Sequence, residues 1–340
     1  MQQIRLDEIL FHGAISLERV GEGVRAWRLP FDEISLYAPP LVEQARQPAG
    51  VRIGFVSNTR TVVLGLVPID EERQVDLVLD DELVQTGIVA PGADSVRFEG
   101  LPEREKRIEL YLSQKADMVI TGLSIDADAT RSLLPDDRPR WITYGSSITQ
   151  AKAAASPAQT WPAIVARRQK LHLTALGYSA QCHMEPMVAR MIRDLDADFI
   201  SLCIGINIQG GASLSPRTFK WAAVGMVKII RERHPEIPIV VQSPIFSPDR
   251  EINENVVGLN LVKMREELAD AVERLRALGD DRLFYLDGLK IFGPEHIDHL
   301  PDRLHPDAEG YRIMADNFEK YVMEEMGIAK MLAEKTSGRA

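Results

Sequence analysis

Residues 141–149 read Trp-Ile-Thr-Tyr-Gly-Ser-Ser-Ile-Thr, and this stretch decides the fold that we predict. Residues 141–144 are apolar or β-branched over a short length, which is typical of a buried strand. Gly145 ends the run, and a serine in front of a new helix is often no more than its N-cap. We therefore expect a buried strand followed by a turn that carries Ser146 and Ser147.

Short apolar runs and longer helical stretches alternate from this point onward. The expected strands are residues 141–144, 172–176, 199–204, 238–242 and 284–286. The expected helices are residues 157–169, 186–193, 217–233, 257–277 and 308–325. This alternation predicts a parallel sheet that is covered by helices on both faces. Ligands bind at the carboxyl ends of such strands, where Ser147 and Asn207 follow their strands.

The sequence before residue 133 has a different pattern. Short apolar or alternating runs occur at residues 51–56, 61–67, 74–79 and 107–112, separated by turn clusters rich in Pro, Gly and Asp. This spacing predicts an all-β sandwich, similar to a jelly roll. A charged segment with two prolines, residues 133–140, is typical of a linker. We therefore predict domains at 1–135 and 136–330, with a frayed tail at 331–340.

A second motif lies about 155 residues after the first and reads Asp302-Arg303-Leu304-His305-Pro306. A serine hydroxyl is a weak nucleophile until a base takes its proton, and a carboxylate must hold the tautomer of that base. Ser147, His305 and Asp302 can fill these three roles. The short spacing suits one turn that leads into a helix, which we expect to begin at Pro306.

With these two motifs and two others, the chain resembles the SGNH hydrolases, also called GDSL esterases and lipases. The resemblance covers roughly residues 140–326. Its four blocks are Gly145-Ser146-Ser147-Ile148-Thr149, Leu176-Gly177-Tyr178-Ser179-Ala180, Gly205-Ile206-Asn207-Ile208, and Asp302 to Pro306 followed by Gly310-Tyr311. The resemblance implies a three-layer, flavodoxin-like α/β domain after the β-sandwich.

The resemblance also implies a role for each matched residue. Ser147 is the expected nucleophile, His305 the base and Asp302 the carboxylate that orients it. The backbone N–H groups of Ser147 and Ala180 and the side-chain amide of Asn207 are the expected oxyanion donors. Such chemistry calls for no cofactor and no metal.

This chain departs from the family pattern at three positions. Ser146 stands for the usual Asp, Ala180 for the oxyanion Gly, and Ile208 for the second Asp of the third block. Alanine keeps its N–H, provided that its backbone reaches the required conformation without a glycine. The residues that we expect to line the pocket are Gly145, Ser146, Gly205 and His183.

Each residue has a simpler interpretation when it is taken alone. Asp302 could cap the last helix, and Asn207 could end a strand in a turn. His183 is more often a hydrogen-bonded structural histidine than a pocket residue, and Cys182 could be a rival nucleophile or a buried thiol. His296 and His299 lie among acidic residues, but their spacing matches no strong zinc pattern and favours a solvated loop.

The amino-acid composition excludes some classes of binding partner and indicates the cellular compartment. The chain has 340 residues, 45% of them apolar, and a net charge of −10, which argues against nucleic acid or an anionic membrane as partner. Its two cysteines are far apart, and neither a signal peptide nor an apolar run of membrane-spanning length is visible. We expect a cytoplasmic protein and leave open whether it is a homo-oligomer.

The leading hypothesis is an acyl-ester hydrolase that acts through an acyl-serine on a small-molecule or carbohydrate ester, with a short acyl group preferred. An acyltransferase would share the acyl-enzyme. The segment with Ser156-Pro157 and Trp161-Pro162 resembles a subgroup that includes natural-product acyltransferases. A carbohydrate-binding protein is a third hypothesis, in which the β-domain would bind sugars through aromatic residues; those available are Trp27, Phe31, Tyr37 and Phe55.

Overall fold

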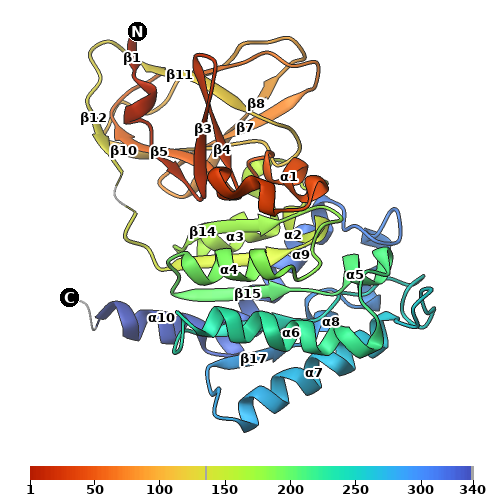
Figure 1. Cartoon of the computed structure of the whole chain (residues 1–340). Coiled ribbons are helices and arrows are strands. Elements are labelled where there is room, and N and C mark those ends of the chain that lie inside the picture. The colour runs from red at the N-terminus through yellow and green to blue at the C-terminus, as the bar shows by residue number, and fades with distance from the viewer. Residues whose placement is uncertain (135, 338–340) are drawn as a thin grey trace.

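The chain folds into a β-rich N-terminal part stacked on a helix-rich C-terminal part (Figure 1). The structure is a computed structural model that describes residues 1–134 and 136–337. Residue 135, where we predict the domain boundary, lies outside the described residues, so the boundary itself stays a prediction.

Two antiparallel sheets form the N-terminal part. The first has the order β3-β4-β11-β6-β9, with β1 paired to β11; these strands are β1 (Gln2–Ile4), β3 (Ser16–Val20), β4 (Gly23–Trp27), β6 (Val62–Leu66), β9 (Ser95–Phe98) and β11 (Val119–Ile125). The second has the order β12-β5-β10-β7-β8, with β2 paired to β5; these strands are β2 (Phe11–His12), β5 (Arg52–Ser57), β7 (Arg73–Leu79), β8 (Glu82–Val89), β10 (Lys106–Tyr111) and β12 (Arg131–Leu133). Leu64 and Leu123 of the first sheet share one buried cluster with Ile53 and Leu77 of the second. The predicted sandwich is therefore confirmed.

The N-terminal part also contributes to the core of the C-terminal part. Three short helices lie between its strands, η1 (Leu6–Glu8), η2 (Phe31–Leu36) and α1 (Pro39–Ala45). Several of its buried residues belong to the same apolar cluster as the C-terminal sheet; they are Trp27, Leu29, Tyr37, Leu41, Ala45, Val78 and Tyr111. A continuous apolar core thus joins the two parts.

A five-stranded parallel sheet with the order β14-β13-β15-β16-β17 forms the centre of the C-terminal part. The strands are β13 (Arg140–Gly145), β14 (His172–Gly177), β15 (Phe199–Cys203), β16 (Ile239–Gln242) and β17 (Leu283–Leu286). Helices α4 (Pro186–Asp194), α6 (Pro216–Arg231) and α7 (Leu261–Ala277) pack in a row on one face, and α3 (Trp161–Arg168) and α9 (Ala308–Phe318) pack together on the other (Figure 1). The predicted three-layer fold is confirmed.

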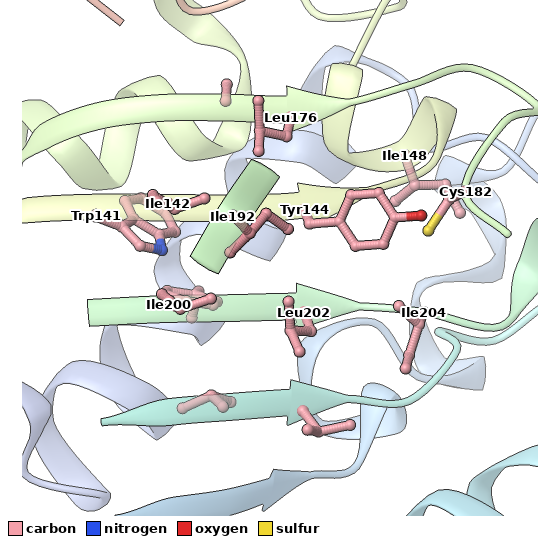
Figure 2. Close-up of a cluster of buried hydrophobic side chains, with 14 of the residues drawn as sticks. Trp141, Ile142, Tyr144, Ile148, Leu176, Cys182, Ile192, Ile200, Leu202 and Ile204 are labelled. Atoms are coloured by element: carbon pink, nitrogen blue, oxygen red, sulfur yellow. The ribbon is translucent and has the colours of Figure 1, made fainter. Parts of the chain in front are cut away.

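Trp141 anchors the centre of this sheet. Figure 2 shows it on β13 beside Ile200 of β15, with Ile192 of α4 packed over the strands. Its ring stacks on Phe318 of α9 at 5.2 Å between centroids. Its indole N–H donates to Ser201 Oγ over 3.0 Å, so the buried nitrogen has a partner.

Several element boundaries differ from the sequence prediction. Helix α7 begins at Leu261 and not at residue 257, because the Asn260 side chain accepts the Lys263 N–H and caps it. The expected frayed tail is wrong for its first residues, since α10 (Ile328–Ser337) continues through them and buries Leu332; residues 338–340 lie outside the described residues. The remaining short elements are α2 (Ser147–Gln150), η3 (Pro157–Gln159), α5 (Ile206–Gly211), α8 (Gly288–Ile291), η4 (Pro294–His299) and the π-helical η5 (Glu319–Glu325).

Among the described residues, no helix combines the length and the apolar character that crossing a membrane requires.

Candidate active site

The predicted site residues gather at the edge of the parallel sheet where β13, β14 and β15 end. Gly145, the last residue of β13, pairs in register with Gly177, the last residue of β14. β15 pairs with β13 on its other side. The chain leaves these three strand ends directly into the segments that hold Ser147, Ala180 and Asn207.

The turn after β13 is built around Ser146 and Gly145. Ser146 is the N-cap of α2, and its hydroxyl accepts the Ile148 N–H over 3.2 Å. The helix cap is therefore Ser146, and the interpretation of Ser147 as a mere cap is wrong. A Cβ at Gly145 would lie 2.1 Å from Thr149 Oγ1, so this turn excludes every other side chain. Ser147 begins α2 with its hydroxyl free for another partner.

That partner is His305, and the structure brings Asp302 into the same chain of contacts. Ser147 Oγ lies 2.8 Å from His305 Nε2, and His305 Nδ1 lies 2.6 Å from Asp302 Oδ2. Asp302 Oδ1 also accepts the backbone N–H groups of Leu304 and His305. Partial burial raises the pKa of Asp302, but these hydrogen bonds outweigh it and hold the pKa below its ordinary value. The carboxylate thus stays ionised beside the imidazole.

Helix α9 begins at Ala308, where the expected helix 308–325 also begins. Its N-cap is Asp307, whose carboxylate accepts the Gly310 N–H over 2.7 Å. Only the suggestion that Pro306 is the first helical residue is wrong, and Asp302 to His305 form a separate turn before the helix. This separation leaves Asp302 free to orient His305, because Asp307 caps α9.

Arg303, a position at which the Asp-x-x-His motif allows any residue, connects this turn to the loop after β16. Arg303 has a positive φ of 63°, which is uncommon for a side-chain-bearing residue. Its guanidinium makes a forked ion pair with both oxygens of Asp249, and its carbonyl accepts the Ser247 hydroxyl. Sequence reasoning missed Asp249, because 54 residues separate it from Arg303.

Two of the expected oxyanion donors lie on neighbouring segments that are joined by a hydrogen bond: Ala180 on the loop after β14, and Asn207 in the first turn of α5. Asn207 Oδ1 accepts the backbone N–H of Cys182 over 3.0 Å. Ala180, two residues earlier, has a φ of 59°, in the left-handed region that glycine favours. Ala180 thus adopts a backbone conformation that a glycine would reach at less cost.

His183 stabilises the loop that carries Ala180. Its Nε2 lies 3.0 Å from the Ala180 carbonyl oxygen, and its Nδ1 lies 2.7 Å from Ser213 Oγ. Both ring nitrogens are therefore engaged with the protein, which supports the structural interpretation of this histidine over a pocket role.

The third block is shaped by Gly205 and Ile208. Gly205 has a φ of 130°, and a Cβ there would lie 2.5 Å from Pro244 Cγ. Ile208 is fully buried in the core, which explains why an apolar residue stands where the family has an aspartate. Gly205 therefore serves the backbone shape, and the polar residue of this block is Asn207.

The alternative nucleophile and the sugar-binding surface find no support. Burial raises the pKa of the Cys182 thiol well above its ordinary value, so it stays protonated. Trp27, Tyr37 and Phe55 are buried in the core, where no sugar could stack on them, and Phe31 is half-buried.

Two groups of histidines lie near carboxylates and could in principle bind a metal ion. His296 and His299 bond to separate carboxylates, Glu295 and Asp307. Within the described residues, His12, Asp136 and His172 form a group whose ligand atoms all lie within 4.8 Å. Its chemistry suits a metal poorly, because the guanidinium groups of Arg52 and Arg138 already pair with Asp136. A cation would have to displace them.

Comparisons with known proteins identify the family. The model of the GDSL-like lipase/acylhydrolase family matches residues 139–323, more than half of the chain. The chain belongs to this family. A second model, that of the SsfX3 N-terminal domain, matches residues 9–121. Curated protein sequences gave no match.

One solved structure resembles this GDSL-family chain over both parts. It is the salicylyl-acyltransferase SsfX3 from a tetracycline biosynthetic pathway, which is 32% identical and has a TM-score of 0.90; the match covers 96% of this chain and 98% of that one. The family membership and this likeness make the protein an enzyme that acts on acyl esters.

Two further structures share the fold at lower identity. A protein of Bacteroides ovatus, described as GDSL-like lipase, is 23% identical with a TM-score of 0.77, and the match covers 98% of each chain. A family two carbohydrate esterase from Clostridium thermocellum is 13% identical with a TM-score of 0.67, and the match covers 94% of this chain and 99% of that one.

Proposed function

We propose that the enzyme is a carboxylic ester hydrolase that forms an acyl-serine at Ser147. The observation that carries the proposal is the continuous contact from Ser147 Oγ to His305 Nε2 at 2.8 Å and from His305 Nδ1 to Asp302 at 2.6 Å. His305 takes the proton of Ser147 as Oγ attacks the ester carbonyl carbon. The tetrahedral intermediate then collapses, and His305 gives that proton to the leaving alcohol.

Charge builds up on the carbonyl oxygen during this step. The donors available at the sheet edge are the N–H groups of Ser147 and Ala180 and the side-chain Nδ2 of Asn207. Water then attacks the acyl carbon while His305 takes its proton. As this second intermediate collapses, the bond to Ser147 Oγ breaks, His305 returns the proton to Oγ, and the acid leaves. Asp302 stays ionised throughout, which stabilises the imidazolium that forms in each half of the reaction.

An acyltransferase is the second candidate, and a specific observation favours it. The likeness to SsfX3, a salicylyl-acyltransferase, extends over the N-terminal part as well as the catalytic part. The acyl-serine would be the same, and an acceptor hydroxyl would replace water in the second step. A small-molecule or carbohydrate acyl ester suits either reaction. For location we propose the cytoplasm, since Cys182 and Cys203 are both free thiols.

The test uses p-nitrophenyl acetate with the full-length protein. Wild type should release p-nitrophenol, and Ser147→Ala should reduce the rate to that of the uncatalysed reaction. Sugar or phenolic alcohols are then added, and the products are separated. Acetate alone supports the hydrolase, and an acetylated alcohol supports the transferase. Equal rates for wild type and Ser147→Ala would contradict both.

A further inference from the structure

Gln150 is fully buried at the end of α2, and its side-chain amide is hydrogen-bonded at every position. Its Nε2 donates to Gln47 Oε1 over 2.7 Å and to the Gln114 carbonyl oxygen over 3.1 Å. Its Oε1 accepts the backbone N–H and the hydroxyl of Ser179 over 2.9 and 2.8 Å. Two donors and two acceptor sites are the full capacity of a glutamine amide.

These bonds connect three separate segments of the molecule. Gln47 and Gln114 belong to the N-terminal part, whereas Ser179 directly precedes Ala180 in the loop of residues 178–184, which we call the 178–184 loop. Gln150 itself lies three residues after Ser147 in the same short helix. One side chain therefore links the nucleophile, an expected oxyanion donor and the N-terminal part.

Arg28 fixes the start of the same loop from the N-terminal part. Its fully buried guanidinium donates to the carbonyl oxygens of Ala175 and Gly177 at the end of β14, and to that of Gln47. In return, the Tyr178 hydroxyl donates to the Arg28 carbonyl oxygen. The N-terminal part thus holds the loop at Tyr178 through Arg28 and at Ser179 through Gln150.

The loop needs such support because its backbone is not in a relaxed conformation. Ala180 and Met184 both have a φ of 59°, a region that side-chain-bearing residues rarely adopt. Such conformations persist where the surrounding contacts determine them. Here the contacts on one side come from Gln150 and on the other from Asn207 through Cys182.

We propose that Gln150 is a positioning residue through which the N-terminal sandwich sets the oxyanion geometry of the 178–184 loop. The inference rests on the proposed function, because it assigns the loop a part in acyl transfer. The N-terminal part then acts as a structural component of the catalytic site, which differs from a separate ligand-binding module.

We call the hydrogen bonds from Gln47 and Gln114 through Gln150 to Ser179 the Gln150 relay. The test compares substitutions along this relay. Gln150→Met removes all four bonds at similar size. Gln47→Met removes one acceptor, whereas Gln47→Glu keeps an acceptor oxygen for Gln150. Ser156→Ala is the matched control, since Ser156 Oγ also bonds across the two parts, to the buried carboxylate of Asp76, but outside the relay.

We expect Gln150→Met to lower kcat for p-nitrophenyl acetate by about 10- to 100-fold, less than the loss of a whole oxyanion donor, with little change in KM. Gln47→Met should lower kcat by a smaller factor, and Gln47→Glu should restore it. Ser156→Ala should lower the melting temperature and leave kcat unchanged. A kcat that follows the melting temperature across all four variants would overturn the proposal.

Amide hydrogen exchange gives a readout that does not depend on turnover. Gln150→Met and Gln47→Met should speed exchange in the 178–184 loop, and Ser156→Ala should not. Unchanged exchange in Gln150→Met would overturn the relay even if wild type proved active. If wild type showed no reaction at Ser147, the proposed function would fail, and exchange would still decide whether Gln150 holds the loop.

Discussion

Asn207 accepts the backbone N–H of Cys182 at its side-chain Oδ1, over 3.0 Å. This bond fixes which end of the amide belongs to the protein and which end is left for another partner. Because Oδ1 is held by the loop, Nδ2 keeps its hydrogens for an oxyanion. This bond, together with that between His183 and Ser213, positions the loop that carries Ala180 relative to α5, which carries Asn207.

Replacing Asn207 should reduce kcat strongly. Asn207→Ala removes a donor and also leaves the Cys182 N–H without its acceptor, so we expect a loss of about 100- to 1,000-fold. Asn207→Asp should keep the Cys182 bond but offer no donor, and should be nearly as slow. Steady-state kinetics with p-nitrophenyl acetate measures both. If Asn207→Asp matched wild type, Nδ2 would not be an oxyanion donor.

Because of the conformation of Ala180, we expect opposite results from substituting it by glycine and by valine. Glycine tolerates a φ of 59° better than alanine, so Ala180→Gly should leave kcat within about threefold of wild type. A β-branched side chain is least suited to this region, so Ala180→Val should lower both kcat and the melting temperature. Equal behaviour of Gly and Val at this position would show that the backbone conformation of Ala180 does not matter.

Asp302 and Asp307 allow a matched test on two neighbouring carboxylates, one in the turn before α9 and one at its N-cap. Asp302→Asn would favour the wrong tautomer of His305, and we expect kcat to fall by about 10,000-fold. Asp307→Asn should retain activity, because asparagine also caps helices and Asp307 caps α9. Kinetics of both variants at several pH values checks this. A similar loss in both would mean that the turn is merely disturbed.

The interface between the two parts should make stability depend on pH. Burial, together with the charge of Arg52, lowers the pKa of His12 to about 4. The folded protein keeps His12 neutral where the unfolded chain, with an ordinary pKa of about 6.5, binds a proton. More protons are therefore bound by the unfolded state between pH 6.5 and 4, and the free energy of unfolding falls as pH falls through that window.

Melting temperatures between pH 7 and 4 measure this effect. They should fall by several degrees in wild type, and His12→Gln should show a smaller fall. His296→Gln, which changes a histidine of η4 outside this interface, should keep the wild-type slope. An identical pH slope for His12→Gln and wild type would exclude His12 as the cause.

The fold could be read from the sequence because its signals are local. Trp141 and its neighbours form a short apolar run, and the expected strands lie within one or two residues of the observed ones. Asp302 and His305 are three positions apart, so their contact needs only one turn of chain. The start of α7 was less predictable, since it is set by the side-chain cap of Asn260.

The support of the site could not be read in this way. Gln150 meets Gln47 across 103 positions, and Arg28 meets Gly177 across 149. A glutamine or arginine in such a stretch carries no local pattern that separates a buried relay from a solvated surface residue. Only the packing of the sandwich onto the parallel sheet brings these partners together.

The most direct test of the central claim is the intact mass of the protein after brief mixing with p-nitrophenyl acetate, measured for wild type and Ser147→Ala. We predict a burst of p-nitrophenol with one acetyl group added to wild type and none added to Ser147→Ala. Peptide mapping should locate the acetyl group on Ser147. Turnover by wild type without an adduct at Ser147, or an equal adduct on Ser147→Ala, would contradict an acyl-serine mechanism.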